Sequence, residues 1–410
     1  MFDVYEIRKD FPLIMRGYKG KRIVFLDNTA STQKPRQVIE KIKELYECCY
    51  ANIHRGLYDL SLDISEQYEE AHKKVARFIN ARSWEEIIFV RNATEAINLV
   101  AYAWGLRNLR RGDEIVLSIM EHHSNIVPWY LISQLTGAEI KVVDITDEGK
   151  LRYDMLEELI TERTKIVSIL HASNVLGTIN DVERIAKIAH KNGALFLVDG
   201  AQSVPHLKVD VQKIDADFLA FSGHKMLGPP VGVLYGKKEI LEEMSPFLGG
   251  GDMISDVVYK EGRFEITWNK LPWKFEAGTP AIVEGIALGT AVEYLERLGM
   301  DNVREHEVRL TKFAMELLEG LDRIRIYGPK RAEERVGVIA FSVEGARPEI
   351  IAMMLNEYGI CVRSGMHCAH PLHRRLGIKD GTVRMSFYIY NTEEEIEYAY
   401  KALSEILRRV

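Results

Sequence analysis

Seven short apolar runs recur between residues 86 and 235, and helical patterns separate most of them. Each run is rich in Ile, Val, Leu and Phe, which is typical of strands buried on both faces of a sheet. Strands that alternate with helices predict an α/β fold with a mostly parallel central sheet and helices on both faces. The runs are EIIFV (86–90), EIVLS (114–118), EIKVV (139–143), KIVSIL (165–170), ALFLV (194–198), FLAF (218–221) and VGVLY (231–235).

The C-terminal part has a different pattern. VGVIAFSV (336–343) and TVRMSFYIY (382–390) indicate strands of a smaller α+β domain. Thr392 and Glu395 then open an amphipathic helix as a capping box. A helical stretch from about 284 to 320 would join the two parts. We divide the chain into an N-terminal segment that packs with the small domain (1–25), a large domain (26–295) and a small C-terminal domain (296–410).

Composition narrows the class of protein. With 410 residues, 47% of them hydrophobic and 28% charged, the chain has the make-up of an ordinary globular protein with room for two domains. A net charge of −6 gives no reason to expect a nucleic-acid partner. We find neither a signal peptide nor an apolar run that would cross a bilayer. Four unevenly spaced cysteines do not suit a disulfide framework, so we expect free thiols in a reducing cytoplasm.

Polar side chains follow five of the predicted strands, at the point where each strand ends. In open α/β sheets, ligands bind beyond the carboxyl ends of the strands, so we expect these side chains to meet in one crevice. The first group also starts a helix, because Asn92 can cap it with Glu95 in the capping-box position. In chain order the groups are Asn92–Glu95, His122 and His123, His171 and Asn174, Asp199 and Gln202, and Ser222–Lys225.

Each of these residues taken alone has a simpler explanation. A carboxylate such as Asp199 often only caps the next helix, and His122 and His123 can be histidines of the core. HCAHPLH (367–373) lacks the regular spacing of a zinc site, and GGG (249–251) lacks the strand–glycine–helix setting of a dinucleotide fingerprint. We therefore expect no metal, and it is the convergence of the five groups that favours a ligand site.

A lysine, a carboxylate, a histidine and a helix start together indicate pyridoxal phosphate (PLP), held as a Schiff base. Lys225, partly desolvated, would be a better nucleophile toward an aldehyde than a solvated ammonium. Asp199 would face the pyridine nitrogen. Thr94 lies in the first turn of a helix, where a phosphate is favoured, and Ser222 and His224 would add donors to that phosphate.

Seven motifs together resemble the class V aminotransferase-type enzymes, and within them the SufS-type cysteine desulfurases, which include selenocysteine lyases. The similarity runs from LDNTASTQKP (26–35) to YNTEEE (390–395), with the motifs in the expected order. It implies the aspartate-aminotransferase-like PLP fold type I, with PLP in the large domain and a cysteine loop in the small one. The motifs are HRGLYDLS, EHHSNIVPW, SNVLGT, VDGAQS, SGHK, FEAGTP and RSGMHCAHP.

The resemblance implies a role for each matching position. Lys225 matches the Schiff-base lysine, Asp199 the partner of the ring nitrogen and His122 the histidine that stacks on the ring. Further matches are Thr94, Ser222 and His224 to phosphate ligands, Gln202 to the contact with the ring oxygen, Asn174 and Arg384 to residues that hold the substrate carboxylate, and Arg363, His54 and Arg55 to other substrate-site residues.

Thr279, in FEAGTP, matches a residue that reaches the phosphate of the neighbouring subunit. The resemblance therefore implies a homodimer with shared sites. Its position before Pro280 also fits an ordinary turn residue, and the chemistry alone does not separate the two explanations.

Cys368 matches the cysteine that attacks the substrate sulfur in this family. Gly365 would give its loop mobility, and Arg363 and His367 would favour the thiolate. Met366 departs from the many members that carry a histidine at this position, two residues before the cysteine. The other cysteines have structural explanations, Cys361 as a strand core position and Cys48 and Cys49 on a helix.

The activity implied is the conversion of L-cysteine to L-alanine, with a persulfide on Cys368 that passes to an acceptor protein of iron–sulfur cluster assembly. A second possibility is a selenocysteine lyase or cysteine-sulfinate desulfinase, because selenium and sulfinate leave without a protein thiol. A third, from another class, is a non-catalytic scaffold in a sulfur-transfer complex, which would stay colourless with added cofactor.

Overall fold

A seven-stranded sheet forms the centre of the computed structural model, which describes residues 3–410. The strands lie in the order β2-β8-β7-β6-β5-β3-β4. All neighbours are parallel except β8, which is antiparallel to both β2 and β7. The strands are β2 (Ile87–Val90), β3 (Glu114–Ser118), β4 (Glu139–Val143), β5 (Thr164–Leu170), β6 (Leu195–Asp199), β7 (Phe218–Ser222) and β8 (Gly232–Gly236).

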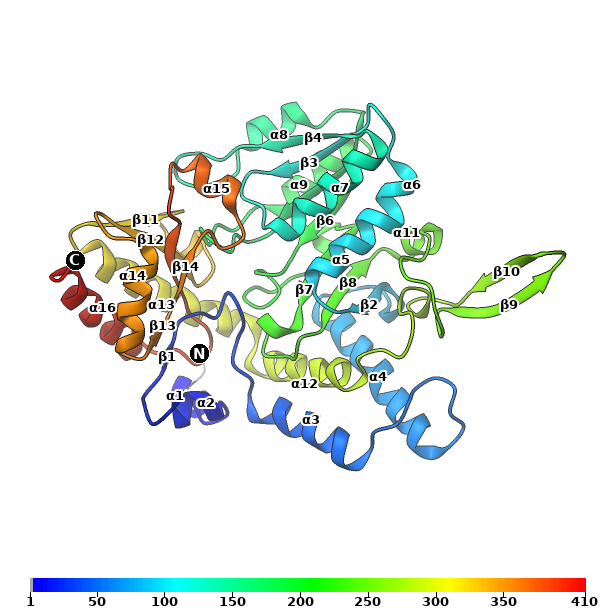
Figure 1. The fold of residues 1–410 in the computed structure, drawn as a ribbon, viewed down its shortest axis with the longest axis horizontal. Helices are drawn as coiled ribbons and strands as arrows, with labels where there is room; N and C mark the ends of the chain where they lie inside the picture. The colour runs from blue at the N-terminus through cyan, green and yellow to red at the C-terminus, as the bar shows by residue number, and fades with distance from the viewer. Residues whose placement is uncertain (1–2) are drawn as a thin grey trace.

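Helices cover both faces of this sheet (Figure 1), which confirms the predicted α/β class. Successive side chains of a strand point to opposite faces. Leu219 and Phe221 of β7 belong to a core cluster with residues of α4, α8, α9, α10 and α12, whereas Phe218 and Ala220 belong to one with residues of α5, α7 and α11. The helices are α4 (Asp59–Phe78), α5 (Ala93–Leu99), which continues through a π-helical stretch (Val100–Gly105) into α6 (Leu106–Asn108), α7 (Val127–Thr136), α8 (Tyr153–Leu159), α9 (Val182–Lys191), α10 (Val211–Ile214), α11 (Lys238–Glu243) and α12 (Ile282–Leu298).

The prediction that all seven strands are buried on both faces is wrong for β4. Glu139 and Val142 are exposed there and only Val143 is fully buried, whereas every residue of the adjacent β3 is buried. β4 is the edge of the sheet and has a neighbouring strand on one side only. An apolar run therefore identified the strand but not its place in the sheet.

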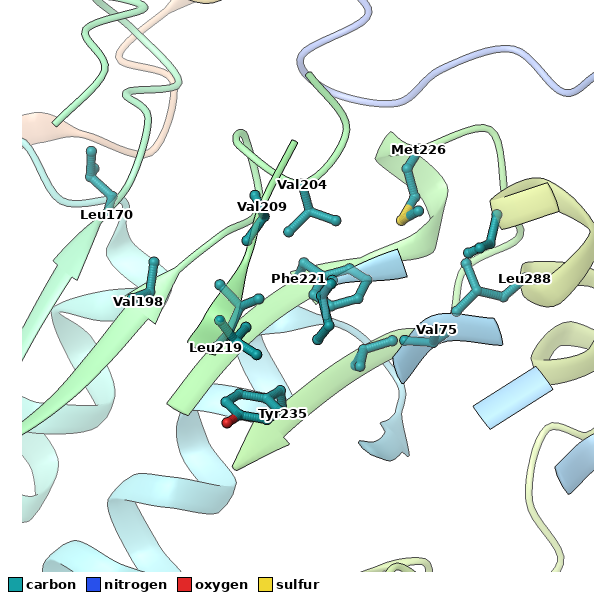
Figure 2. Packing of buried hydrophobic residues seen from close by; sticks show 14 of the residues in the cluster. Val75, Leu170, Val198, Val204, Val209, Leu219, Phe221, Met226, Tyr235 and Leu288 are labelled. Atoms are coloured by element: carbon teal, nitrogen blue, oxygen red, sulfur yellow. The ribbon is translucent and has the colours of Figure 1, made fainter. Parts of the chain in front are cut away.

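Figure 2 shows the core beneath the turn that follows β7. Leu219 and Phe221 lie beside Tyr235 of β8, and Val75 of α4 and Leu288 of α12 belong to the same cluster. None of the five is more than 2% exposed. Burying a side chain of this size contributes about 1.5–3 kcal/mol to stability. The cluster therefore fixes the end of β7 and the position of the turn after it.

A smaller antiparallel sheet, β11-β12-β15-β14, lies to one side of the central sheet together with helices from the C-terminal part of the chain (Figure 1). Its own core contains Phe341, Met385 and Leu403. The predicted strands at 336–343 and 382–390 are shorter than expected. These elements are α13 (Met300–Glu319), β11 (Ile324–Tyr327), β12 (Val338–Val343), α14 (Pro348–Glu357), β14 (Arg363–Gly365), α15 (His370–Arg375), β15 (Thr382–Ser386) and α16 (Glu393–Leu407).

The N-terminal segment contacts elements from the end of the chain. β1 (Val24–Phe25) pairs in parallel with β13 (Ile360–Cys361). Arg8 makes an ion pair of 2.9 Å with the buried carboxylate of Glu395. The division of the chain into domains at residues 26 and 296 stays a prediction. The helices of this region are α1 (Val4–Arg8), α2 (Pro12–Arg16) and α3 (Arg36–Cys48).

One of the two capping boxes forms as predicted. Thr392 accepts from the backbone N–H of Glu395, and the Glu395 carboxylate accepts from that of Thr392, so the box of α16 is complete. At α5, Asn92 accepts from the Glu95 N–H at 3.0 Å, but the Glu95 carboxylate accepts from the N–H of Arg91 instead. The second cap is therefore one-sided.

A two-stranded hairpin, β9 (Ile254–Lys260) and β10 (Arg263–Trp268), projects from the body of the molecule (Figure 1). Apolar side chains on it lie outside any core. The exposed apolar residues of the hairpin are Val257, Val258, Tyr259, Phe264, Ile266 and Trp268.

Among residues 3–410, no helix is both long and apolar enough to cross a membrane.

Replacing Gly232 by alanine should move the start of α5. A Cβ at Gly232 would lie 2.4 Å from the backbone of Asn92, so the two segments must separate. We expect the free energy of unfolding, measured by urea denaturation, to fall by about 1–3 kcal/mol. Gly249→Ala is the matched control, because nothing lies within 4 Å of a Cβ there. Equal stability of the two variants would contradict this packing.

Candidate active site

The loops that follow β2, β3, β5, β6 and β7 line one cavity of about 310 Å³. Because these strands all run in one direction, their carboxyl ends meet at one edge of the sheet. The segment after β1 and strands of the smaller sheet complete the wall. Of the residues singled out in the sequence, this wall contains Thr94, His122, Asn174, Asp199, Gln202, Ser222, His224, Lys225, Arg363, Cys368 and Arg384.

Lys225 ends a single 3-10 turn, Gly223–Lys225, between the antiparallel strands β7 and β8. The turn is tight, since a Cβ on Gly223 would lie 2.9 Å from a carbonyl oxygen of the following segment. Met226, the next residue, is fully buried in the core (Figure 2). Burial lowers the pKa of the Lys225 amine to about 8, although the Asp199 carboxylate acts to raise it. Near pH 8, about half of this amine is therefore neutral and nucleophilic.

Asp199 is the last residue of β6, in register with Leu170 of β5 and Ala220 of β7. Its carboxylate accepts from the backbone N–H of Ala201 at 3.0 Å. Only 5% of the residue is exposed. Burial raises its pKa, while the Ala201 hydrogen bond and the positive charge of Lys225 lower it. The carboxylate and the amine therefore affect each other's ionisation.

His122 lies at the start of the turn after β3 and accepts from the backbone N–H of Ser124 at its Nδ1, at 3.1 Å. Nε2 then carries the ring proton. Burial, together with the smaller effect of the Lys225 charge, lowers the pKa of His122 to about 3. The ring is consequently neutral at physiological pH. A ring that stacks on an aromatic ligand needs no charge.

Glu121, which the sequence analysis did not single out, fixes the loop that carries the next histidine. It accepts from Ser118 Oγ at 2.5 Å, Asn125 Nδ2 at 2.7 Å and the backbone N–H of Leu170 at 3.0 Å. Burial raises its pKa to about 8. This carboxylate therefore ties the end of β3 to the end of β5. Its signal in the sequence is an acid directly after an apolar run.

Neutral donors occupy another part of the wall. Thr94 Oγ1 lies 2.7 Å from Ser124 Oγ, and Ser222 Oγ accepts from the backbone N–H of Ala93 at 2.9 Å. Burial lowers the pKa of His224 to about 4, so its ring carries no charge at neutral pH. These hydroxyl and imidazole groups suit hydrogen bonds to an anion but do not neutralise it.

Two arginines share Asp27, a residue whose role the sequence analysis did not identify. Arg363 contacts both carboxylate oxygens, at 2.8–3.2 Å, and Arg384 Nη2 lies 3.5 Å from one of them. Arg384 also donates to the carbonyl oxygen of Asn174 at 2.9 Å. Burial lowers the pKa of Arg384 to about 10, so it stays charged at neutral pH. Asp27 follows the apolar pair of β1, as the other site residues follow their strands.

Cys368 is exposed at the cavity and has a left-handed backbone, with φ of +55°. Its carbonyl oxygen accepts from the backbone N–H of His123 at 2.8 Å. The expectation that His367 favours the thiolate is wrong. Its Nε2 lies 3.0 Å from Thr382 Oγ1, and burial lowers its pKa to about 2, so it has no positive charge to offer. Arg363, Arg384 and Lys225 are the cations that share the cavity with Cys368.

Glu95, His123 and His171, which were expected in the crevice, do not line this cavity, and three residues matched to the family, His54, Arg55 and Thr279, also lie outside it. The His54 ring is 4.3 Å from that of Trp273, and Arg55 makes an ion pair of 3.0 Å with Asp252. Thr279 is exposed in the turn before α12. Within one chain these residues do not meet Lys225, and their roles stay predictions.

The other cysteines are free thiols. Cys48 is the last residue of α3, in agreement with its expected place on a helix, and it is exposed there. Cys49 is half-buried. Cys361, in β13, is also half-buried, and burial raises the pKa of its thiol.

Several buried polar atoms in the cavity wall have no partner within residues 3–410. A ligand that brings both donors and acceptors would satisfy them, since a buried polar group without a hydrogen bond is costly. No group of three potential metal ligands occurs among the described residues. The unpartnered atoms are Thr29 Oγ1, Asn174 Oδ1, Gln202 Oε1, His367 Nδ1 and Arg384 Nε.

Residues 24–399 match the family model described as aminotransferase class-V. The chain belongs to the aminotransferase class-V family. Within it, the chain is 48% identical over 405 residues to a protein named probable cysteine desulfurase of Halobacterium salinarum, covering 98% of this chain and 96% of that protein. It is 46% identical over 415 residues to the cysteine desulfurase of Haloferax volcanii, with 98% and 96% coverage.

Solved structures of cysteine desulfurases have a similar fold. The apo structure of a cysteine desulfurase from Thermococcus onnurineus NA1 has a TM-score of 0.94 and 40% identity, covering 100% of this chain and 99% of that one. The cysteine desulfurase CsdA of Escherichia coli has a TM-score of 0.91 and 36% identity, with 100% coverage of both chains.

The reactivity of Lys225 should follow its lowered pKa. In the apoprotein, the rate of reductive methylation of this lysine, followed by peptide mass spectrometry, should be half-maximal near pH 8. Asp199→Asn should move the midpoint to lower pH, because the carboxylate raises the pKa of the amine. The rate at exposed Lys43 should not respond to that substitution. A midpoint that moves upward in Asp199→Asn would contradict the electrostatic coupling.

Proposed function

We propose that this chain is a PLP-dependent cysteine desulfurase that converts L-cysteine to L-alanine and leaves the sulfur as a persulfide on Cys368. One observation carries the proposal: a single cavity brings together the amine of Lys225, the carboxylate of Asp199 and the thiol of Cys368. The named relatives, nearly full-length and close to half identical, support the same activity.

The wall of the cavity fits PLP. Lys225 would hold its aldehyde, Asp199 the ring nitrogen, and Thr94, Ser222 and His224 the phosphate. In addition, His122 would stack on the ring. Gln202, whose Oε1 has no partner within residues 3–410, would contact the ring oxygen. When bound, PLP supplies an electron-withdrawing ring that stabilises negative charge at the α-carbon of an amino acid.

The substrate carboxylate would bind at Arg384, with Asn174 beside it. Two contacts hold Arg384 in place, since one nitrogen donates to the Asn174 carbonyl and a second faces Asp27. Its Nε has no partner within residues 3–410. This holds the α-carbon of the amino acid in a fixed orientation, which lowers the entropic part of the barrier. Lys225, with its pKa of about 8, is then suited to take the α-proton and return it later.

Cys368 would accept the sulfur. Its Sγ, as thiolate, attacks the sulfur of the bound cysteine, an S–S bond forms, and the Cβ–S bond of the substrate breaks. Protons return to the carbon skeleton, so one cysteine and one enzyme thiol become one alanine and one enzyme persulfide. The exposure of Cys368 supports transfer of that sulfur to a second protein, which we propose to be an acceptor of iron–sulfur cluster assembly in the cytoplasm.

Cys368→Ala should lower alanine formation from L-cysteine by about 100-fold or more, because the nucleophile is gone. Alanine and sulfide would be measured together. Selenocysteine and cysteine sulfinate should still be converted, since their leaving groups need no thiol. Cys48→Ala, at another exposed free thiol, is the control. An unchanged rate with L-cysteine in Cys368→Ala would contradict the persulfide step and favour a lyase or desulfinase.

A homodimer fits the residues left outside the cavity. Thr279 is exposed in this chain, and His54 and Arg55 lie in a separate depression beside the base of the β9–β10 hairpin. We propose that a second copy covers this side and that Thr279 contacts the phosphate bound by its partner.

Light scattering should give twice the mass of one chain. Thr279→Ala should weaken PLP retention, measured by dialysis and absorbance, by about threefold to tenfold, as one hydrogen bond to a charged group is lost. Thr146→Ala, at an exposed threonine in the loop after β4, serves as the control. A monomer that retains PLP equally well with and without Thr279 would contradict the shared site.

A further inference from the structure

A half-buried ammonium lies directly behind the lysine turn. Lys34 Nζ donates to the carbonyl oxygen of His224 at 3.0 Å and to that of Thr32 at 2.8 Å. The His224 carbonyl also accepts from the backbone N–H of Thr32 at 3.0 Å, and Thr32 Oγ1 accepts from the N–H of Leu227 at 2.9 Å. These hydrogen bonds join the segment after β1 to the turn that carries Lys225.

Lys34 has no counterion among residues 3–410. Its Nζ has no carboxylate oxygen within 4.0 Å, and burial alone lowers its pKa to about 8. An ammonium has three N–H donors, and the two carbonyl oxygens account for two of them. A cation held away from water without an opposite charge is unfavourable, so this place in the fold favours an anion nearby.

The groups proposed to hold the PLP phosphate contain no cation of their own. Thr94 and Ser222 offer hydroxyls, and His224 is neutral because burial lowers its pKa to about 4, with the charges of Lys225 and Lys34 acting in the same direction. The remaining cations of the cavity wall, Arg363 and Arg384, face Asp27. A phosphate monoester carries nearly two negative charges at neutral pH.

We propose that Lys34 is a positioning residue that supplies the countercharge for the PLP phosphate, acting through the His224 carbonyl and its turn. The inference rests on the proposed function, because it takes PLP as the ligand. Through Lys34, the segment after β1 would make the protein prefer PLP over pyridoxal. Pyridoxal has the same ring and aldehyde but no phosphate.

The test compares the affinity of the full-length apoprotein for PLP and for pyridoxal, by absorbance titration at pH 7.5. Lys34→Met keeps the length of the side chain and removes the charge. We expect PLP binding to weaken by about tenfold, as for one screened charge interaction, and pyridoxal binding to change by less than about twofold. Lys34→Arg should restore most of the preference. Lys43→Met, an exposed lysine on α3, should leave both affinities unchanged.

A stability measurement separates charge from architecture. If Lys34 only held the turn in place, Lys34→Met would lower the melting temperature of the apoprotein and weaken both aldehydes equally, which would overturn the proposal. We expect instead an apoprotein at least as stable as the parent, and a smaller rise in melting temperature on adding PLP. An unchanged preference for PLP in Lys34→Met would overturn the proposal while leaving the proposed function intact. Wild-type protein that binds neither aldehyde would overturn both.

Discussion

The site depends on the parallel alignment of β3, β5, β6 and β7. Their register places Leu170, Asp199 and Ala220 side by side at the carboxyl edge. Because both faces of these strands are buried under helices, most of their polar side chains lie at or just beyond a strand end. The polar residues of the site therefore lie at this edge, and the apolar residues packed beneath them fix their positions.

Desolvation then sets the charge of each group in the cavity. It brings the pKa of Lys225 down to about 8 and those of His122 and His224 to about 3 and 4, and it raises that of Asp199. The result is a reactive amine among neutral rings. Arg384 remains charged and lies beside Asp27. Its positive charge is at the end of the cavity where an amino-acid carboxylate would bind. Burial thus favours the neutral amine and the neutral rings that the proposed roles require, whereas the Ala201 hydrogen bond and the charge of Lys225 favour the carboxylate of Asp199.

The sequence allowed the sheet and the contents of its edge to be predicted, because buried strands are continuous apolar runs and polar residues follow them directly. It did not reveal that β4 is an exposed edge or that β8 runs antiparallel, since an apolar run has no direction. Asp27 and Lys34 act on residues about 200 to 350 positions away, and no local pattern marks such contacts. The side chain of His367 turns toward Thr382, which its position beside Cys368 did not indicate.

The proposed function requires that Lys225, and no other lysine, reacts with the aldehyde of the cofactor. Incubation with PLP, reduction with borohydride and peptide mapping by mass spectrometry measures this directly. A pyridoxyl adduct at Lys225 alone, at one per chain, is the result that the structure predicts. An adduct at other lysines with Lys225 unmodified, or none at all, would contradict it.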